Sequence, residues 1–389
     1  MTLHTGRHFL QIPGPTNVPD RVLHATARPT IDHRGPEFGE LGARVLAGVR
    51  EVFQTTGPVI IYPASGTGAW EAALANTLQP GDGVVIYETG HFATLWAEMA
   101  RELQLDVTFL EGDWRRGVIA DRIGEVLAAD TDHRIKAVLA THNETSTAVT
   151  SDIPAVRAAI DRVEHPALLL ADTVSSLGSM DYRHEEWGVD VTVSGSQKGL
   201  MLPPGISFTA LSERAVEVSR TGGMPRSYWR WETMLAANET GFFPYTPATN
   251  LLYGLDEAIA MLREEGLPQV FARHHRLAEA TRRAVAAWEL ELLAVNPSER
   301  SDALTAVLMP DGHDADALRA VILERFDTSL GAGLGKVKGR VFRIGHLGHF
   351  NEPMLLGTLG AVEAGLVAAG VPFSRGGVDA AIDYLVATG

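Results

Sequence analysis

Short apolar runs alternate with amphipathic stretches along residues 38–211, and this alternation constrains the fold more than any other feature of the chain. The apolar runs have the length of strands, whereas the intervening stretches carry apolar residues every three or four positions, as helices do. A chain that repeats strand, helix, strand forms a mostly parallel sheet flanked by helices, with ligands bound at the carboxyl ends of the strands. We therefore predict an α/β fold. The predicted strands are 59–62, 84–87, 107–110, 137–140, 167–171 and 189–194, and the predicted helices are 67–78, 94–103, 121–129 and 153–163.

The chain is too long for one hydrophobic core, because single cores stop growing at about 250–300 residues and this chain has 389. After a loop rich in glycine and aromatic residues at 222–247, we expect a helix at 251–265 that bridges two domains, and a second helix at 270–288. The strands predicted at 289–295, 303–309 and 340–344 and the helices at 314–326 and 353–369 indicate a smaller α+β C-terminal domain. The predicted divisions are an N-terminal segment at 1–20, a large domain at 21–265 and a small domain at 266–389.

The acidic composition excludes several classes of partner. The 48 acidic residues outnumber the 33 basic ones, for a net charge of −15, and no cluster of lysine and arginine interrupts this background. We expect no binding to nucleic acid or to anionic membranes. The chain has no cysteine, which excludes disulfides and zinc–thiolate sites and fits a reducing cytosol. Residues 1–11 lack the apolar core of a signal peptide, and no apolar run reaches about 18 residues, so we expect a cytoplasmic protein.

The histidines and serines do not form the motifs of metal enzymes or hydrolases. None of the 14 histidines lies in an H-E-x-x-H pattern or a comparable ligand set, so we expect no catalytic metal. Ser65, Ser175 and Ser196 lack the G-x-S-x-G sequence of a nucleophile elbow, which argues against a serine hydrolase.

Lys198 stands at the end of a predicted strand, within the sequence SGSQKG at 194–199. A lysine there can form a Schiff base with a cofactor aldehyde, while neighbouring hydroxyl and N–H groups can bind a phosphate. Taken alone, it is more commonly a solvated surface lysine. Asp172 ends another predicted strand, where a carboxylate can face a pyridine nitrogen or cap a turn. Neighbouring strand ends would bring Asp172 and Lys198 into one cleft.

Small residues also separate a predicted strand from a helix in the sequence SGTGAWE at 65–71. The N–H groups at a helix start bind phosphate, although a glycine-rich start is also a common packing device. This segment has neither the G-x-G-x-x-G spacing of a dinucleotide site nor the G-K-[ST] of a nucleoside triphosphate loop. Phe92 could stack on a ring bound in the cleft or pack in the core. Arg343 could hold a substrate carboxylate or form a structural ion pair.

Together and in this order, these motifs resemble the class V aminotransferases, and particularly the serine–glyoxylate and alanine–glyoxylate aminotransferases. Those enzymes have the fold-type I architecture and depend on pyridoxal 5'-phosphate. The resemblance covers nearly the whole chain. It rests on PGPTNVP at 13–19, SGTG at 65–68, THNETST at 141–147, Asp172, SGSQK at 194–198 and FRIGHLG at 342–348.

The resemblance implies a role for each matching residue. Lys198 would carry the cofactor and move a proton between the substrate α-carbon and the cofactor. Asp172 would pair with the pyridine nitrogen, and Phe92 would stack on the ring, where relatives often have tryptophan. The implied cofactor site also includes Thr67, Gly68 and Gln197 at the phosphate, Thr145 near the 3-hydroxyl group, and Ala69, Val174 and Tyr245 beside them.

The resemblance further implies a homodimer with its active sites at the interface. Thr246 would reach the phosphate in the neighbouring subunit. His33 and Arg34 would approach the partner's substrate pocket, or else form an interface ion pair. Ala69 stands where alanine-specific relatives tend to carry histidine, which favours the serine–glyoxylate branch. The implied substrate-binding residues are Arg343, for the α-carboxylate, with His33, Arg34 and Thr145.

The activity implied by the resemblance is transfer of the amino group of L-serine, or of a similar small amino acid, to glyoxylate, giving hydroxypyruvate and glycine. Alanine, aspartate or ureidoglycine as donor, an aminophosphonate substrate or a lyase reaction would use the same cofactor residues. A catalytically idle relative serving as a binding or scaffold subunit is a further alternative. The presence of both Lys198 and Asp172 argues against it.

Overall fold

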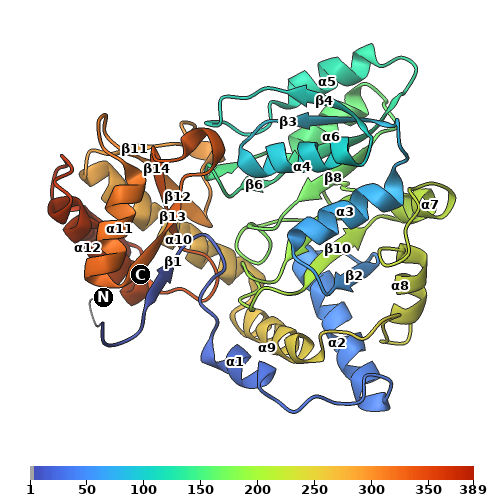
Figure 1. The fold of residues 1–389 in the computed structure, drawn as a ribbon, viewed down its shortest axis with the longest axis horizontal. Helices are drawn as coiled ribbons and strands as arrows, with labels where there is room; N and C mark the ends of the chain where they lie inside the picture. Colours follow the sequence, from blue (N-terminus) through green and yellow to red (C-terminus); the bar gives the residue numbers. More distant parts are fainter. Residues whose placement is uncertain (1–3) are drawn as a thin grey trace.

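Two sheets organise the chain in the computed structural model, which describes residues 4–389 (Figure 1). The first three residues of the predicted N-terminal segment lie outside the described residues. The larger sheet has seven strands, in the order β2 (Val59–Tyr62), β10 (Ser207–Leu211), β9 (Val191–Gly195), β8 (Leu168–Asp172), β5 (Ile135–Thr141), β3 (Gly83–Tyr87) and β4 (Asp106–Leu110).

The large sheet is mostly parallel, as predicted. From β9 through β8, β5 and β3 to β4, each strand runs parallel to its neighbour. The six predicted strands are present. The prediction lacks β10, which pairs antiparallel with both β2 and β9. Its sequence, SFTAL, has no continuous apolar run because Ser207 and Thr209 interrupt it, although both side chains are fully buried.

Helices cover both faces of the large sheet, which confirms the predicted α/β fold. Alternate residues of β2 show the division, since Val59 and Ile61 join one core and Ile60 and Tyr62 join another. A strand that is covered on both faces carries apolar side chains on both sides, so its sequence is nearly all apolar. This pattern allowed most of these strands to be predicted. One layer holds α2 (Pro36–Phe53), α5 (Ala120–Ala129), α6 (Ile153–Arg162) and α9 (Thr249–Glu265), and the other holds α3 (Gly66–Thr77), α4 (His91–Glu102), α7 (Glu213–Thr221) and α8 (Trp231–Asn238).

The smaller sheet combines segments from both ends of the chain. Its strands follow the order β1 (Phe9–Gln11), β13 (Thr328–Ala332), β14 (Val341–Gly345), β12 (Leu304–Leu308) and β11 (Glu291–Leu292), and β1 pairs parallel with β13. The prediction lacks β1, β13 and α13. A separate apolar core binds this sheet to α10 (Leu267–Ala287), α11 (Ala315–Phe326), α12 (Glu352–Ala368) and α13 (Gly377–Ala387).

The predicted bridging helix does not span the two sheets. Helix α9 packs on α1 (Asp20–Thr26) and α2, beside the large sheet. The chain then turns at Gly266, whose φ of +85° suits glycine. Helix α10 follows and packs on α13 and β12 of the small sheet. The turn at Gly266 therefore carries the chain from one sheet to the other.

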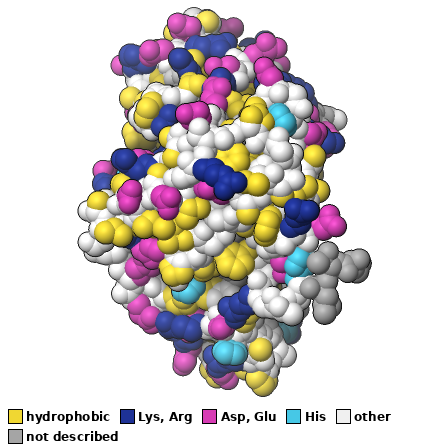
Figure 2. Space-filling model, turned by 90° about the vertical axis from the view of Figure 1, so that its left-hand side faces the viewer, with side chains coloured by type: hydrophobic (Ala, Val, Ile, Leu, Met, Phe, Trp, Pro, Cys, Tyr) yellow, Lys and Arg dark blue, Asp and Glu magenta, His cyan; other side chains and the backbone are white. Residues whose placement is uncertain are grey.

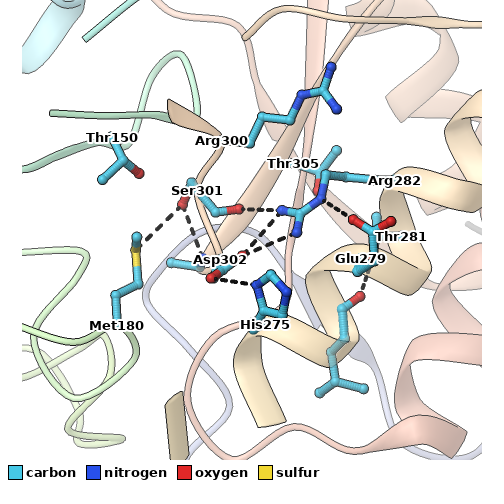
Figure 3. Close-up of polar contacts among 12 residues, drawn as sticks. Thr150, Met180, His275, Glu279, Thr281, Arg282, Arg300, Ser301, Asp302 and Thr305 are labelled. Carbon is cyan, nitrogen blue, oxygen red and sulfur yellow. Dashed lines mark hydrogen bonds and ion pairs between the residues drawn. The ribbon is translucent and has the colours of Figure 1, made fainter. Parts of the chain in front are cut away.

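A polar cluster joins α10 to the chain segment that approaches the large sheet (Figure 3). Arg282 donates to the carbonyl oxygen of Ser301 at 3.1 Å and to the Asp302 carboxylate at 3.2 Å. His275 Nδ1 lies 3.0 Å from the same carboxylate. The Ser301 N–H donates to the carbonyl oxygen of Ala148 at 3.0 Å. The ion pairs hold residues 301 and 302 against α10, and the backbone hydrogen bond from Ser301 to Ala148 links this segment to the larger part of the chain.

The surface shows no segregation of charge on the face seen in Figure 2, where basic and acidic side chains are interspersed with apolar ones. Within residues 4–389, no helix is long and apolar enough to cross a membrane. The same residues contain no group of three His, Asp or Glu side chains arranged to hold a metal ion.

Candidate active site

Lys198 is buried where the chain leaves β9, so it is not a solvated surface lysine. Burial, together with the nearby Arg343 cation, lowers the pKa of the Lys198 ammonium to about 7, against the opposing effect of Asp172. The Nζ atom donates a hydrogen bond to the carbonyl oxygen of Pro13. An appreciable fraction of the lysine is therefore neutral at pH 7. The neutral amine is the form that attacks an aldehyde or accepts a proton from carbon.

The N-terminal segment closes over the lysine side chain. Gly14 has a φ of +101°, and a Cβ atom there would lie 2.4 Å from Cδ of Lys198. Thr16 holds the lysine backbone, since its Oγ1 donates to the Lys198 carbonyl oxygen at 3.2 Å. The Thr16 N–H donates to the Gln197 carbonyl oxygen at 3.1 Å. Glycine at position 14 thus leaves the space that the lysine occupies.

Asp172 ends β8, the parallel neighbour of β9, and its side chain is buried. Burial raises the pKa of the Asp172 carboxyl to about 7, while the Val174 N–H at 2.7 Å and the Lys198 charge oppose this rise. The Trp70 indole also lowers that pKa, although its Nε1 makes no well-formed hydrogen bond within the described chain. Asp172 and Lys198 therefore share one buried space at adjacent strand ends.

A cavity of about 440 Å³ opens at this edge of the large sheet. A cavity of this size, lined by both apolar and polar side chains, suits a small-molecule site. The predicted residues that line it are Thr67, Phe92, Thr145, Asp172, Val174, Gln197 and Lys198. The other lining residues are Gly14, Pro15, Ser65, Gly66, Trp70, Leu95, Glu98, Met99 and Glu102.

One end of the cavity is formed by the start of α3. A Cβ atom at Gly66 would lie 2.7 Å from the Val174 side chain, so glycine lets the helix approach this closely. Ser65 precedes the helix but does not cap it with its side chain. Gln197 Oε1 is buried beside Gly195 and has no hydrogen-bond partner among the described residues. The uncapped N–H groups at the start of α3 are suited to a phosphate, and the Gln197 amide nitrogen is a further possible donor.

Phe92 faces the cavity as the second residue of α4. Its ring meets the edge of Trp70, with 6.5 Å between the ring centroids. The backbone N–H of Phe92 donates to the Glu144 carboxylate at 3.3 Å. The ring is thus available to stack on a planar ligand, with Trp70 beside it.

Arg343 reaches the site from β14 of the small sheet. Its Nε donates to the Ala332 carbonyl oxygen at 2.7 Å, and its Nη1 donates to the Thr145 carbonyl oxygen at 2.6 Å. Burial lowers the pKa of Arg343 to about 10, so the side chain is still a cation at neutral pH. Arg343 is not part of the cavity lining, but it contacts Thr145, which is. Its Nη2 makes no hydrogen bond to the described residues and is oriented by the other two nitrogens.

The remaining predicted residues lie away from the cavity of their own chain. Ala69 is buried in the core, and Gly68 packs against Ala64 and Trp229. The Tyr245 hydroxyl donates to the Ile61 carbonyl oxygen at 2.9 Å. Thr246 and Arg34 lie in loops and are exposed. His33 lies in a loop and is partly buried, and its Nε2 has no hydrogen-bond partner in the described chain.

Sequence reasoning assigned no role to several residues at this site. Pro13 and Gly14 contact the lysine, Trp70 stands beside the aspartate, and Glu144 lies behind Phe92. Each of the four lies in one of the motifs PGPTNVP, SGTGAWE and THNETST. None has a periodicity or spacing that indicates its contact, because each contact joins segments far apart in the chain.

The residues present fit pyridoxal 5'-phosphate. A buried amine with a pKa near 7 suits its aldehyde, and a buried carboxyl one strand away suits its pyridine nitrogen. The orphaned Gln197 Oε1 and Trp70 Nε1 atoms are polar groups of the cavity wall that a bound ligand can satisfy.

Comparisons with known proteins agree with this geometry. Residues 8–333 match the model of the family Aminotransferase class-V. The L-aspartate–glyoxylate aminotransferase of Paracoccus denitrificans is 47% identical over 382 residues, covering 98% of this chain and 96% of its own. The serine–glyoxylate aminotransferase of Methylorubrum extorquens is 48% identical over 391 residues, covering 99% and 97%. The solved pyridoxamine–pyruvate aminotransferase from Mesorhizobium loti has a TM-score of 0.93 and 27% identity, covering 100% of both chains.

The family match spans most of the chain, and the relatives align over nearly their full lengths. The fold is that of the fold-type I enzymes, with a buried lysine at the edge of the mostly parallel sheet. The chain belongs to the class-V aminotransferases, and its cofactor is pyridoxal 5'-phosphate.

Proposed function

We propose that this aminotransferase moves the amino group of L-serine, or of a similar small amino acid, to glyoxylate, giving hydroxypyruvate and glycine. The observation that carries the transamination chemistry is the buried Lys198 beside Asp172 in a cavity of about 440 Å³. The named activity of the Methylorubrum extorquens relative supports serine as the donor. The Paracoccus denitrificans relative supports L-aspartate as a second candidate donor, and both names support glyoxylate as the acceptor.

Lys198 is proposed as the residue that attaches the cofactor and moves the proton. When bound, pyridoxal 5'-phosphate supplies an aldehyde for the amino group and a ring that withdraws electrons from the substrate α-carbon. The neutral Nζ of Lys198 would accept the proton that leaves the substrate α-carbon and would give it up again to complete the transfer of the amino group. Its lowered pKa keeps the amine available for this work near pH 7.

The other cavity residues orient and polarise the bound ring. Asp172 holds a proton at the pyridine nitrogen, which increases the electron demand of the ring. Phe92 stacks on one face of the ring. Thr67 and Gln197 bind the phosphate together with the N–H groups at the start of α3.

Arg343 is proposed to hold the substrate carboxylate through Nη2, while its other nitrogens stay bonded to the protein. The amino acid and the oxo acid both carry a carboxylate next to the reacting carbon. One arginine therefore serves both half reactions. Because the two half reactions use a single site in turn, the kinetics are ping-pong.

We also propose a cytoplasmic homodimer with its active sites at the interface. Thr246 and Arg34 are exposed and do not line the cavity of their own chain, which supports a role at a partner's site. The absence of cysteine fits a reducing compartment. We place the large domain at 21–265 and the small domain at 266–389, a division supported by the turn at Gly266. Within the segment 1–20, strand β1 pairs with β13 of the proposed small domain.

A donor and acceptor screen tests the proposed reaction. The purified enzyme, saturated with cofactor, is assayed with serine, alanine and aspartate against glyoxylate and pyruvate. Serine with glyoxylate should give the highest kcat/KM. A higher value for aspartate or alanine would replace the donor assignment, and a lack of transamination with every pair would overturn the proposal.

A further inference from the structure

Helix α4 begins without a cap of its own. Its N-cap residue is Gly90, which has no side chain to accept hydrogen bonds from the first turn. The acceptors come instead from the hairpin of β6 (Asn143–Glu144) and β7 (Val149–Thr150). Ser146 Oγ accepts from the His91 N–H at 2.9 Å. The Glu144 carboxylate accepts from the next two N–H groups of the helix, at 3.3 Å and 3.1 Å. A distant part of the chain therefore holds the start of α4.

The Glu144 side chain is fully buried, and both of its oxygens accept hydrogen bonds. Oε1 accepts from the Phe92 N–H and also from the N–H and hydroxyl of Ser146, at 3.0 Å and 2.6 Å. Oε2 accepts from the Ala93 N–H. A carboxylate at the positive end of a helix dipole, bonded to backbone N–H groups, makes stronger contacts than a neutral cap. The first turn of α4 is thus fixed relative to the hairpin.

The space around Glu144 is tight on the helix side. A Cβ atom at Gly90 would lie 2.5 Å from Cγ of Glu144 and 2.5 Å from Ser146 Oγ. The carboxylate reaches the helix only because position 90 is glycine. Five residues of α4 line the cofactor cavity: Phe92, Leu95, Glu98, Met99 and Glu102. Where the helix starts therefore decides where this wall of the cavity lies.

Glu144 does not line the cavity, so its effect on the site is indirect. Its negative charge opposes the lowering of the Lys198 pKa by burial, and it adds to the raised pKa of Asp172. It also favours the charged form of Arg343. The same side chain thus fixes a helix and sets part of the charge balance of the site.

We propose that Glu144 is a positioning residue for the transamination: by fixing the first turn of α4, it sets the Phe92 ring against the bound cofactor. This inference rests on the proposed function, because Phe92 meets the cofactor only if the cavity is its binding site.

The test compares Glu144→Gln with a matched control, Glu363→Gln. Glu363 is also a carboxylate at the start of a helix, accepting from the Gly376 N–H at 3.4 Å and the Val378 N–H at 3.2 Å. It lies in the small domain, among residues that do not line the cavity. The Glu363 carboxylate also accepts from Trp288 Nε1 at 2.8 Å, so the control measures the loss of a hydrogen-bonded capping carboxylate away from the cavity.

In Glu144→Gln, an amide NH2 group replaces one acceptor oxygen and faces donors of the first turn. We expect the dissociation constant for pyridoxal 5'-phosphate to rise roughly tenfold, as lost aromatic stacking predicts. The circular dichroism of the cofactor's visible band should weaken, because the ring is held less firmly. Glu363→Gln should leave both quantities unchanged.

If Glu144→Gln lowers the melting temperature but leaves cofactor affinity and circular dichroism as in the wild type, the residue is only structural and the inference fails. If that variant does not fold, Ser146→Ala replaces it. Ser146→Ala keeps the carboxylate but removes the hydroxyl that bonds both Glu144 and the His91 N–H, so the affinity and the dichroism should shift in the same direction by less. No shift in this variant would also overturn the inference.

The wild-type enzyme separates this inference from the proposed function. If the wild type forms no cofactor band that depends on Lys198, the proposed function itself is wrong. If the wild type forms the band and transaminates while Glu144→Gln matches it in every readout, only the role of Glu144 is wrong.

Discussion

The Nη1 atom of Arg343 donates a hydrogen bond to the carbonyl oxygen of Thr145 at 2.6 Å, and this contact joins the small sheet to the wall of the cofactor cavity. Thr145 lines the cavity, whereas Arg343 lies in β14. A substrate carboxylate held by the arginine is therefore placed by the way the two sheets meet. Arg343 contributes both a positive charge and a fixed geometry to this site. A substitution that keeps the charge but changes the geometry separates the two contributions.

Replacing Arg343 with lysine should raise KM for both the amino acid and glyoxylate by roughly ten- to a hundredfold, since hydrogen bonds to charged groups contribute about 1.5–3 kcal/mol. Lysine keeps the positive charge. It lacks the planar guanidinium group that can donate at once to the carbonyl oxygens of Ala332 and Thr145 and to a substrate carboxylate. The check is steady-state kinetics with each substrate varied in turn. A fall in kcat with both KM values unchanged would contradict a carboxylate-binding role.

The rate at which the cofactor-free enzyme captures pyridoxal 5'-phosphate should increase as pH rises through about 7. Capture requires the neutral amine, and the pKa of Lys198 is lowered to about 7, so its neutral fraction grows over this interval. Stopped-flow absorbance from pH 6 to 11 measures this rate. Lys198→Ala should show no borohydride-sensitive band at any pH. A capture rate that first rises near pH 10 would mean that the lysine is solvated.

Gly14→Ala should reduce kcat by roughly a hundredfold, the effect expected when a catalytic group is displaced by about 1 Å. A Cβ atom would lie 2.4–2.6 Å from Cδ, Cε and Nζ of Lys198, so the flexible lysine must move aside. Gly81→Ala is the matched control, because Gly81 has a φ of +90° but an open environment. Both variants should lose stability through the positive φ. If Gly14→Ala and Gly81→Ala have equal kcat values, crowding of the Lys198 side chain does not affect catalysis.

The parts of the fold and site that sequence predicts are those with strong local signals. The strand that ends at Asp172, LLLAD, is buried on both faces, so its apolar run is unmistakable. The strand near Lys198, VTVSG, alternates valine with polar residues, a period-two pattern that also predicts a strand, and the shared sheet edge follows. The small residues at 65–68 likewise mark the start of a helix. β10 was missed because its serine and threonine are buried within the sheet, a burial that hydrophobicity does not indicate.

Contacts between distant segments are the parts that sequence does not predict. Pro13 bonds Lys198 across 185 positions, and Arg343 bonds Thr145 across 198 positions. β1 pairs with β13 although neither has a continuous apolar run, since TSLGA contains serine and glycine. Such pairings depend on the assembled sheets, so no local pattern in either segment encodes them.

Mild acidification should destabilise the protein through its buried histidines. Burial lowers the pKa of His142, His184 and His274 to about 4 and that of His346 to about 3, from 6.5 when exposed. Their stabilising effect is complete above pH 6.5 and is lost as pH falls towards 4, by up to roughly 3 kcal/mol each. Asp172 and His275 act in the opposite sense because their pKa values are raised, but they are two groups against four.

Denaturant unfolding at pH 7.5, 6.0 and 5.0 measures this loss in the free energy of unfolding. His142→Phe keeps an aromatic ring beside Tyr182 and Trp187 but cannot be protonated, so its unfolding free energy should depend less steeply on pH. Equal slopes for the variant and the wild type would show that His142 does not contribute.

If each active site contains residues of both subunits, two inactive variants should regain activity when they form a mixed dimer. Suppose that Arg34 serves the partner's site while Lys198 serves its own. A mixed dimer of Lys198→Ala with Arg34→Ala then contains one site with both defects and one intact site. Random pairing makes half of all dimers mixed, so co-expression should recover about a quarter of wild-type activity. Each variant expressed alone gives the baseline, and no recovery above it would place Arg34 in the site of its own chain or outside the site altogether.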